Sequence, residues 1–192
     1  MPSAVTIIKD EHRAMGSVLR GLSHLVEEIR GGQPPDFKLL HAIVRYIDAF
    51  PDRLHHPKED DYLYKVLRQR APEVSGVLDA LQDEHARGPG ETQRLSHALD
   101  AYERDEAAFA SFAGAVSRYA EFQYAHMRKE EGEILPVAER ALQADDWSQI
   151  DAAFSSNNDP IVGVPVQKEF RELFRKIVNL MPAPAGLGPA RR

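Results

Sequence analysis

The sequence predicts an all-α fold, an up-down-up-down antiparallel four-helix bundle with one or two extra C-terminal helices. Apolar residues recur at helical spacing through four long stretches of the chain, as expected of helices that bury one face. Short Gly- and Pro-containing segments separate these stretches, and short loops join antiparallel neighbours in a bundle. No stretch shows the strict polar–apolar alternation of a half-buried strand, so β-structure is not expected.

The first two predicted helices run over residues 3–30 and 36–70. Ser3 is a candidate N-cap of the first helix and Asp36 of the second, because their side-chain oxygens accept hydrogen bonds from first-turn N–H groups. The segment 31–35, Gly-Gly-Gln-Pro-Pro, ends the first helix because glycine and proline disfavour helical continuation. The two helices are therefore expected to lie antiparallel.

Proline and glycine also fall inside two of the predicted helices. Pro51 and Pro57 lie within the second helix, and each removes one backbone hydrogen bond, so a kink or a short break is expected there. The third helix covers residues 72–105, and the segment 88–90, Gly-Pro-Gly, is expected to interrupt it.

The fourth predicted helix runs from about residue 106 to 144, and a short helix around 147–154 follows it. A last amphipathic helix covers about residues 166–180, and the Pro-, Ala- and Gly-rich tail after it has a composition typical of disorder. The expected organisation is a bundle over residues 1–145, C-terminal helices packed on it over 146–181, and a disordered tail over 182–192.

The composition narrows the possible functions. The chain has 192 residues, enough for one domain with a full core, and a net charge of -6. This charge gives no general attraction to phosphate backbones, so nucleic acid is not an expected partner. The absence of cysteine excludes disulfides, thiolate zinc sites, iron–sulfur ligation and cysteine nucleophiles. The early apolar run 4–8 is too short to enter or cross a membrane, so a cytoplasmic protein without membrane contact is expected.

One chemical pattern occurs twice, once in the second helix and once in the fourth. Residues 55–60 (HHPKED) and 126–131 (HMRKEE) both read His-x-x-Lys-Glu-acid. Residues four apart lie one above the other on a helix, so each copy presents an imidazole and a carboxylate on one face. Such donors, supplied by two helices, suit iron, manganese or zinc. The candidate ligand pairs are His55 with Glu59 and His126 with Glu130.

The other two helices each offer one histidine at a comparable depth in an antiparallel bundle, His12 and His85. Either His55 or His56 could lie beside Glu59, and the four-residue spacing favours His55. One histidine per helix can therefore converge near one level of the core. The remaining histidines are expected at the surface without a role: His24, His41, His56 and His97.

With these motifs the chain resembles the hemerythrin-like, or HHE cation-binding, family over about residues 4–142. The resemblance is carried by residues 10–12 (DEH), 84–85 (EH) and the two repeated segments. It implies a four-helix bundle around two non-haem iron ions bridged by oxide or hydroxide, for which zinc or manganese could substitute. The ligands that it implies are His12, His55, His85 and His126 as terminal ligands, and Glu59 and Glu130 as bridges.

The chain departs from the oxygen-carrying members of that family at one position. Those proteins have a further histidine one turn before the third-helix ligand, where this chain has Leu81. Six protein ligands are therefore expected instead of seven, and the missing one is water or a nearby side chain such as Tyr62, Glu131 or Glu133. An open metal position favours redox chemistry, nitric oxide or peroxide binding, or iron exchange over simple oxygen carriage.

The expected function is that of a di-iron protein that binds or senses oxygen or a related small ligand such as nitric oxide or peroxide, or that handles iron under oxidative or nitrosative stress. Two alternatives remain. Both copies of the motif contain His-x-x-Lys, as histidine phosphotransfer domains do, but those domains need an exposed histidine, and here an acid follows the lysine. The chain could also be a metal-free helical interaction module, in which the C-terminal helix forms a homodimer.

Overall fold

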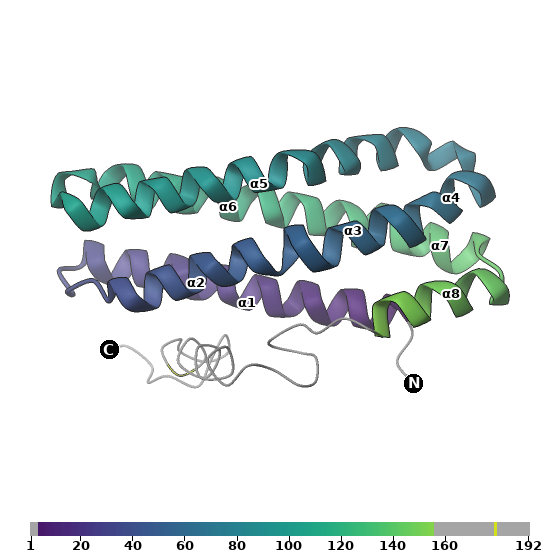
Figure 1. Ribbon diagram of the computed structural model, residues 1–192, viewed down its shortest axis with the longest axis horizontal. Helices are drawn as coiled ribbons and strands as arrows, with labels where there is room; N and C mark the ends of the chain where they lie inside the picture. Colours follow the sequence, from purple (N-terminus) through teal and green to yellow (C-terminus); the bar gives the residue numbers. More distant parts are fainter. Residues whose placement is uncertain (1–3, 156–178, 180–192) are drawn as a thin grey trace.

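Four long helical rods lie side by side in the computed structural model, which describes residues 4–155 and residue 179 (Figure 1). The described part of the chain contains no strand. The helices are α1 (Ala4–Arg30), α2 (Phe37–Ala49), α3 (His56–Lys58), α4 (Lys65–Arg70), α5 (Ser75–Arg104), α6 (Phe109–Lys129), α7 (Leu135–Ala141) and α8 (Ala144–Ser155). The rods are α1, the run α2–α3–α4, α5, and the run α6–α7, so the predicted antiparallel bundle is confirmed.

The C-terminal predictions are only partly covered by the described residues. The short helix expected around 147–154 is present as α8. The helix expected over about 166–180 lies outside the described residues apart from Asn179, and the tail over 182–192 lies wholly outside them. The division of the chain into three parts therefore stays a prediction.

The short connections follow from the residues that cap the helices. Asp36 caps α2 as predicted, because its Oδ1 accepts a hydrogen bond from the backbone N–H of Leu39 at 3.0 Å. Gly32 adopts a φ of 93° in the turn after α1, a conformation that residues with a side chain rarely adopt. Such tight turns bring α1 and the second rod together as antiparallel neighbours.

The irregularity expected near the prolines takes the form of π-helical turns, and the second rod is not broken. One π-turn spans Pro51–His55 and another spans Glu59–Tyr64. In the first, the backbone N–H of His55 bonds to the carbonyl of Phe50, five residues earlier, at 3.2 Å. The fourth rod has a corresponding π-turn at Glu130–Ile134. All three π-turns therefore fall at or beside the repeated His/Glu motif.

The third rod differs from its prediction, because α5 continues through the segment 88–90 without interruption. Pro89 lies inside the helix, where it forfeits one backbone hydrogen bond. Packing supports the helix on both sides of the proline, since Leu81 and Leu95 are fully buried core residues. Tertiary packing thus outweighs the local cost of the proline.

Two apolar clusters fill the bundle, with a buried polar layer between them. The larger cluster is built mainly on α1, α2, α5 and α6, and the smaller one gathers residues of α1, α4, α5, α7 and α8. Every buried charged or histidine side chain of the described residues belongs to the intervening layer. Its members are Glu11, His12, His55, His56, Glu59, His85, His126 and Glu130.

Helix α8 closes the bundle beside this layer. It lies next to α1 (Figure 1), and its Ile150 and Phe154 are buried in the smaller apolar cluster. Lys58 Nζ donates to the carbonyl of Ala153 at 2.9 Å, and the Phe154 ring packs edge-on to His55 with centroids 6.3 Å apart. The polar layer is therefore covered by α8 on that side. No helix of the described residues has a run long and apolar enough to span a membrane.

Candidate metal centre

The six candidate ligands predicted from the sequence come together in the polar layer. Each is at most 8% exposed, although they come from all four rods. With one additional histidine they form two groups of potential metal ligands that share Glu59. The groups are His12, His55, Glu59 and Glu130, and His56, Glu59, His85 and His126.

The first group is compact. His12 Nε2 lies 3.2 Å from His55 Nε2 and 3.2 Å from Glu130 Oε2. His55 Nε2 lies 3.2 Å from Glu59 Oε1, across one turn of the second rod. Two imidazole nitrogens and two carboxylate oxygens therefore converge on one point from α1 and from the two copies of the motif.

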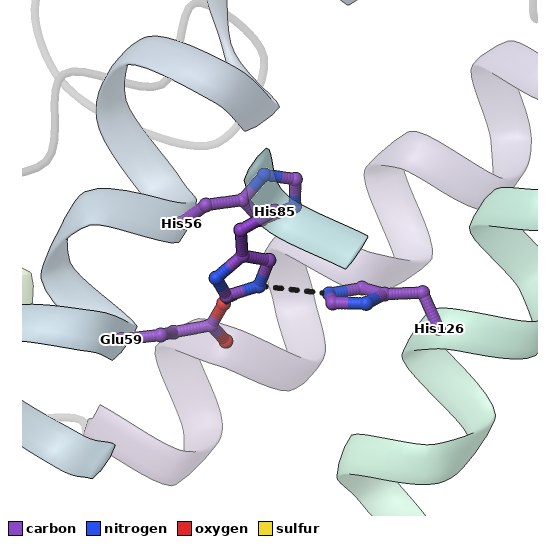
Figure 2. Close-up of side chains that lie close together, drawn as sticks. All are labelled: His56, Glu59, His85 and His126. Atoms are coloured by element: carbon purple, nitrogen blue, oxygen red, sulfur yellow. Dashed lines mark hydrogen bonds and ion pairs between the residues drawn. The ribbon is translucent and has the colours of Figure 1, made fainter. Parts of the chain in front are cut away.

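The second group has the same character (Figure 2). His85 Nε2 lies 3.1 Å from His126 Nε2 and 3.6 Å from Glu59 Oε2. His56 stacks on His85, with ring centroids 4.2 Å apart and an interplanar angle of 12°. Glu130 also reaches this group, since its Oε2 lies 3.4 Å from His126 Nε2. Both glutamates are thus placed between the two groups.

The predicted surface position of His56 is wrong, because this histidine is 5% exposed and lies among the potential ligands of the second group. Successive residues of an α-helix point about 100° apart, so an assumed regular helix turns His56 away when His55 faces inward. The π-turn at Pro51–His55 alters that register and lets both neighbours face the interior. Two prolines flanking a His-His pair were the sequence signal that could have indicated this.

The other residues considered for the seventh position are arranged differently. Leu81 is a fully buried member of the smaller apolar cluster. Tyr62 is 43% exposed and so lies away from the centre. Glu131 contacts the outer nitrogen of His12 and does not belong to either ligand group.

Behind each inward-facing imidazole lies a carboxylate that the sequence analysis did not assign. Four of these acids are within hydrogen-bond distance of an Nδ1 atom, and the fifth lies at ion-pair distance. The pairs are His12 with Glu131 at 2.9 Å, His55 with Glu11 at 2.7 Å, His85 with Asp60 at 3.1 Å, His126 with Glu84 at 2.9 Å and His56 with Asp52 at 3.4 Å. An acid in this position fixes the orientation of a ligating histidine and makes it a stronger donor.

These outer acids determine which ring nitrogen is free to bind a metal. When Nδ1 donates its hydrogen to an acid, the neutral imidazole has an unprotonated lone pair at Nε2. The Nε2 atoms of His12 and His55 then face each other at 3.2 Å, and those of His85 and His126 at 3.1 Å. Lone pairs that converge in this way need a proton or a cation between them.

The inner carboxylates lead to the same conclusion. Glu59 Oε2 and Glu130 Oε2 are buried and have no hydrogen-bond partner among the described residues. A buried anionic oxygen without a partner is costly, and metal coordination removes that cost. The donor set of imidazole nitrogens and carboxylate oxygens therefore fits divalent cations of the iron, manganese and zinc type.

Without a metal, the acids pull protons onto the histidines. Burial opposes the charged form, but Glu59 and Glu11 outweigh it and hold the pKa of His55 well above its usual value. The same balance with Glu130 raises the pKa of His126 to about 9. For His56, burial and the neighbouring imidazoles act together and lower its pKa well below the usual value.

Tyr64 is a further residue at the centre that the sequence analysis missed. Its hydroxyl donates a short hydrogen bond to Glu130 Oε1. Its ring stacks on His85, with centroids 5.6 Å apart and an interplanar angle of 11°. Tyr64 therefore orients one inner glutamate and one histidine from the π-turn Glu59–Tyr64.

A small cavity adjoins the histidines on the side of the larger apolar cluster. Its free volume is about 10 Å³, close to the least that one water molecule needs. Polar walls come from Glu11, Gln123 and the histidines His12, His55, His56 and His126. The remaining walls are Met15, Phe50, Pro51 and Met127. The cavity thus brings a mainly apolar space next to four candidate ligands.

Comparison with known proteins identifies one family. The model of the hemerythrin HHE cation binding domain matches residues 3–138, which include all seven inward-facing donors. No curated protein and no solved structure gives a match.

Proposed function

The chain belongs to the hemerythrin HHE cation-binding domain family, and on that premise we propose that it holds two non-haem iron ions and binds a small ligand beside them. Membership of the family makes it a cation-binding protein. The identity of the metal, the number of ions and the ligand are the proposal. The main support for the proposal is that seven inward-facing donor residues fall into two groups that share Glu59.

Each proposed ion has its own set of histidines. His12 and His55 bind one ion, and His56, His85 and His126 bind the other. Glu59 and Glu130 lie between the groups, so their carboxylates would be shared by the two ions. This unequal distribution leaves more room for an added ligand at the ion with two histidines. Iron in such a centre supplies reversible ligand binding and electron transfer, while the protein supplies orientation and exclusion of water.

The cavity supports a small ligand as the molecule that is bound. It touches both histidines of the first ion, and its free volume of about 10 Å³ is near the least that one water-sized molecule needs, so it suits a very small ligand and excludes a metabolite. The mainly apolar walls admit a diatomic gas and provide few partners for bulk water. We therefore propose binding or sensing of such a ligand, with iron handling under oxidative or nitrosative stress as the physiological setting.

The histidine phosphotransfer alternative does not fit the structure. That function requires a histidine that a partner protein can reach. His55 and His126, the histidines of the two His-x-x-Lys segments, are 4% and 2% exposed. Membership of a cation-binding family likewise argues against a metal-free interaction module.

Metal analysis of protein purified without an affinity tag, combined with its optical spectrum, tests the proposal. We expect two iron ions per chain and near-ultraviolet charge-transfer absorption that changes when nitric oxide or azide is added. His55→Ala and His126→Ala should each lower the iron content, whereas His97→Ala at the exposed surface should not. Retention of two ions in both inner variants would overturn the ligand assignment.

A further inference from the structure

A hollow opens on the outer face of α1 and α6, behind His12. Its volume is about 430 Å³. Three arginines line it, and two residues without a side chain, Gly16 and Gly132, widen it. We call this space the arginine hollow; its lining is Arg13, Arg20, Arg128, Gly16, Gly132, His12, Tyr124, Met127 and Glu131.

Positive charge prevails in the arginine hollow. Glu131 is the one carboxylate among its lining residues, and it is held by His12 Nδ1 at 2.9 Å. The protein as a whole carries a net charge of -6, which repels anions from most of its surface. The three guanidinium groups make this hollow locally more basic than the chain as a whole.

The three arginines differ in the number of partners that their guanidinium groups have. Arg13 pairs with Asp10, and Arg20 donates to Ser17 Oγ at 2.9 Å and also to the Tyr124 hydroxyl, which lines the hollow. Arg128 is exposed and has no ion-pair or hydrogen-bond partner among the described residues. Neither Asp10 nor Ser17 lines the hollow, so neither occupies the space in front of the guanidinium groups. An anion that enters the hollow therefore finds the guanidinium of Arg128 without a competing partner, while Arg13 and Arg20 can exchange theirs.

The arginine hollow and the inner cavity share two walls. His12 and Met127 line both spaces, so these side chains form the partition between the outside and the metal centre. On the outer side of this partition, Arg20 and Tyr124 lie close over Gly16, and the Tyr124 hydroxyl donates to the Gly16 carbonyl at 3.1 Å. A Cβ atom there would lie 3.3 Å from Arg20 Nη1 and 3.6 Å from the Tyr124 ring. Displacement of the flexible Met127 side chain would join the two spaces.

We propose that the arginine hollow is the route by which a small inorganic anion, such as nitrite or azide, reaches the metal centre. The three arginines collect the anion, and Met127 admits it to the inner cavity. This inference rests on the proposed function, because it assigns the class of ligand that the di-iron centre takes. It goes beyond that function by naming the residues that form the path of the ligand.

Stopped-flow measurement of azide binding to the iron-loaded protein tests the route. The variant Arg13→Gln/Arg20→Gln/Arg128→Gln should bind azide about tenfold more slowly at low ionic strength, and the deficit should shrink as salt is added. The control Arg30→Gln/Arg94→Gln/Arg104→Gln makes the same change in net charge at exposed positions outside the hollow. Nitric oxide, a neutral probe, should bind all three proteins equally fast. Equal azide association rates in the two triple variants would overturn the proposal.

Met127→Ala tests the partition. Removal of the side chain should raise the association and dissociation rates of azide together, by about tenfold each, and leave the dissociation constant nearly unchanged. If Met127 merely packs in the core, its removal should change neither the association rate nor the dissociation rate of azide. If Met127→Ala fails to fold, the two triple arginine variants alone test the proposed route, because their substitutions lie at exposed positions.

A metal-free measurement separates this inference from the proposed function. Trp147 is the one tryptophan of the chain, so Trp147→Phe with Tyr124→Trp places a single fluorophore at the arginine hollow. Iodide should quench it about twofold less after loss of the three arginines, while neutral acrylamide should quench it equally. Unchanged iodide quenching overturns the anion-collecting hollow, whatever the metal content. Normal quenching in a protein that binds no iron would instead contradict the di-iron centre.

Discussion

Five imidazoles face the centre of this bundle, and each has a carboxylate behind it. An acid that accepts from Nδ1 orients the ring, selects the tautomer with a free Nε2 and raises the affinity of that nitrogen for a metal. The acids also supply negative charge around the proposed cations. The proposed metal binding therefore depends on the outer acids, such as Glu11 and Glu84, as well as on the proposed ligands.

Loss of an outer acid should weaken metal binding without removing a ligand. Glu11 contacts His55 Nδ1 at 2.7 Å, and Glu11→Gln keeps an acceptor there but loses the charge. We expect the affinity of the protein for iron(II) to fall by about 10- to 100-fold, measured by competition with a chelating dye. Glu103→Gln is the matched control, since Glu103 contacts the surface histidine His41 at 2.7 Å. Equal affinities in the two variants would show that the outer charge has no effect.

His56 provides the sharpest test at a single position. Because it is assigned to only one of the two proposed ions, His56→Ala should reduce tightly bound iron from two ions per chain toward one. Elemental analysis after dialysis measures this directly. His97→Ala, at an exposed position of α5, should retain both ions. A protein with His56→Ala that retains both ions after dialysis would remove this histidine from the ligand set.

At the scale of the element, the π-turns explain which parts of the site the sequence predicted. The His55/Glu59 and His126/Glu130 pairs follow from four-residue spacing, which survives small changes of helical register. The inward turn of His56 depends on a local change from α- to π-helical hydrogen bonding, and no regular period encodes it. The contact between Glu84 and His126 joins α5 to α6. Its prediction would require the rotation of one helix relative to the other, which a single sequence does not specify.

Because α5 approaches the second rod closely, we expect a substitution of Gly88 to destabilise the fold. A Cβ atom at this position would lie 2.4 Å from Asp52 Oδ1, so Gly88→Ala must displace the acid that faces His56. The following proline also disfavours a helical residue with a side chain there. We expect a loss of about 1–3 kcal/mol in the free energy of unfolding and weaker binding of one ion.

Gly90→Ala is the control for this prediction. It lies in the same helix, and the nearest atom to an added Cβ is Arg94 Nη1 at 3.8 Å. Alanine should therefore be neutral there or stabilise the helix by up to about 1 kcal/mol. Thermal melts of both variants make the comparison. Equal melting temperatures would show that Asp52 moves aside without cost.

At the scale of the whole molecule, a charged layer separates the two apolar clusters. Each cluster can form by burial of apolar side chains, but the layer between them contains two carboxylate oxygens without hydrogen-bond partners among the described residues. The bundle itself was predictable because its four long amphipathic rods are separated by short turns. The free-energy cost of placing charge in the core was not predictable from helical periods, and the proposed cations would offset it.

Removal of the metal should consequently lower the stability of the entire bundle. A ligand present at 100 times its dissociation constant stabilises the folded state by about 2.7 kcal/mol. For a domain of this size, chelation of the iron should lower the melting temperature by roughly 5–10 °C, and readdition of iron(II) should restore it. The variant His55→Ala/His126→Ala should show a much smaller response to the same chelator. A wild-type melting temperature that ignores chelation would contradict a metal centre that contributes to folding.

Crystallographic anomalous scattering at the iron absorption edge, on iron-loaded protein, measures the central feature most directly. We expect two anomalous peaks about 3.5–4 Å apart, one within bonding distance of His12 and His55 Nε2 and the other beside His56, His85 and His126, with Glu59 between them. A single peak, or peaks only at surface histidines such as His41, would contradict this expectation.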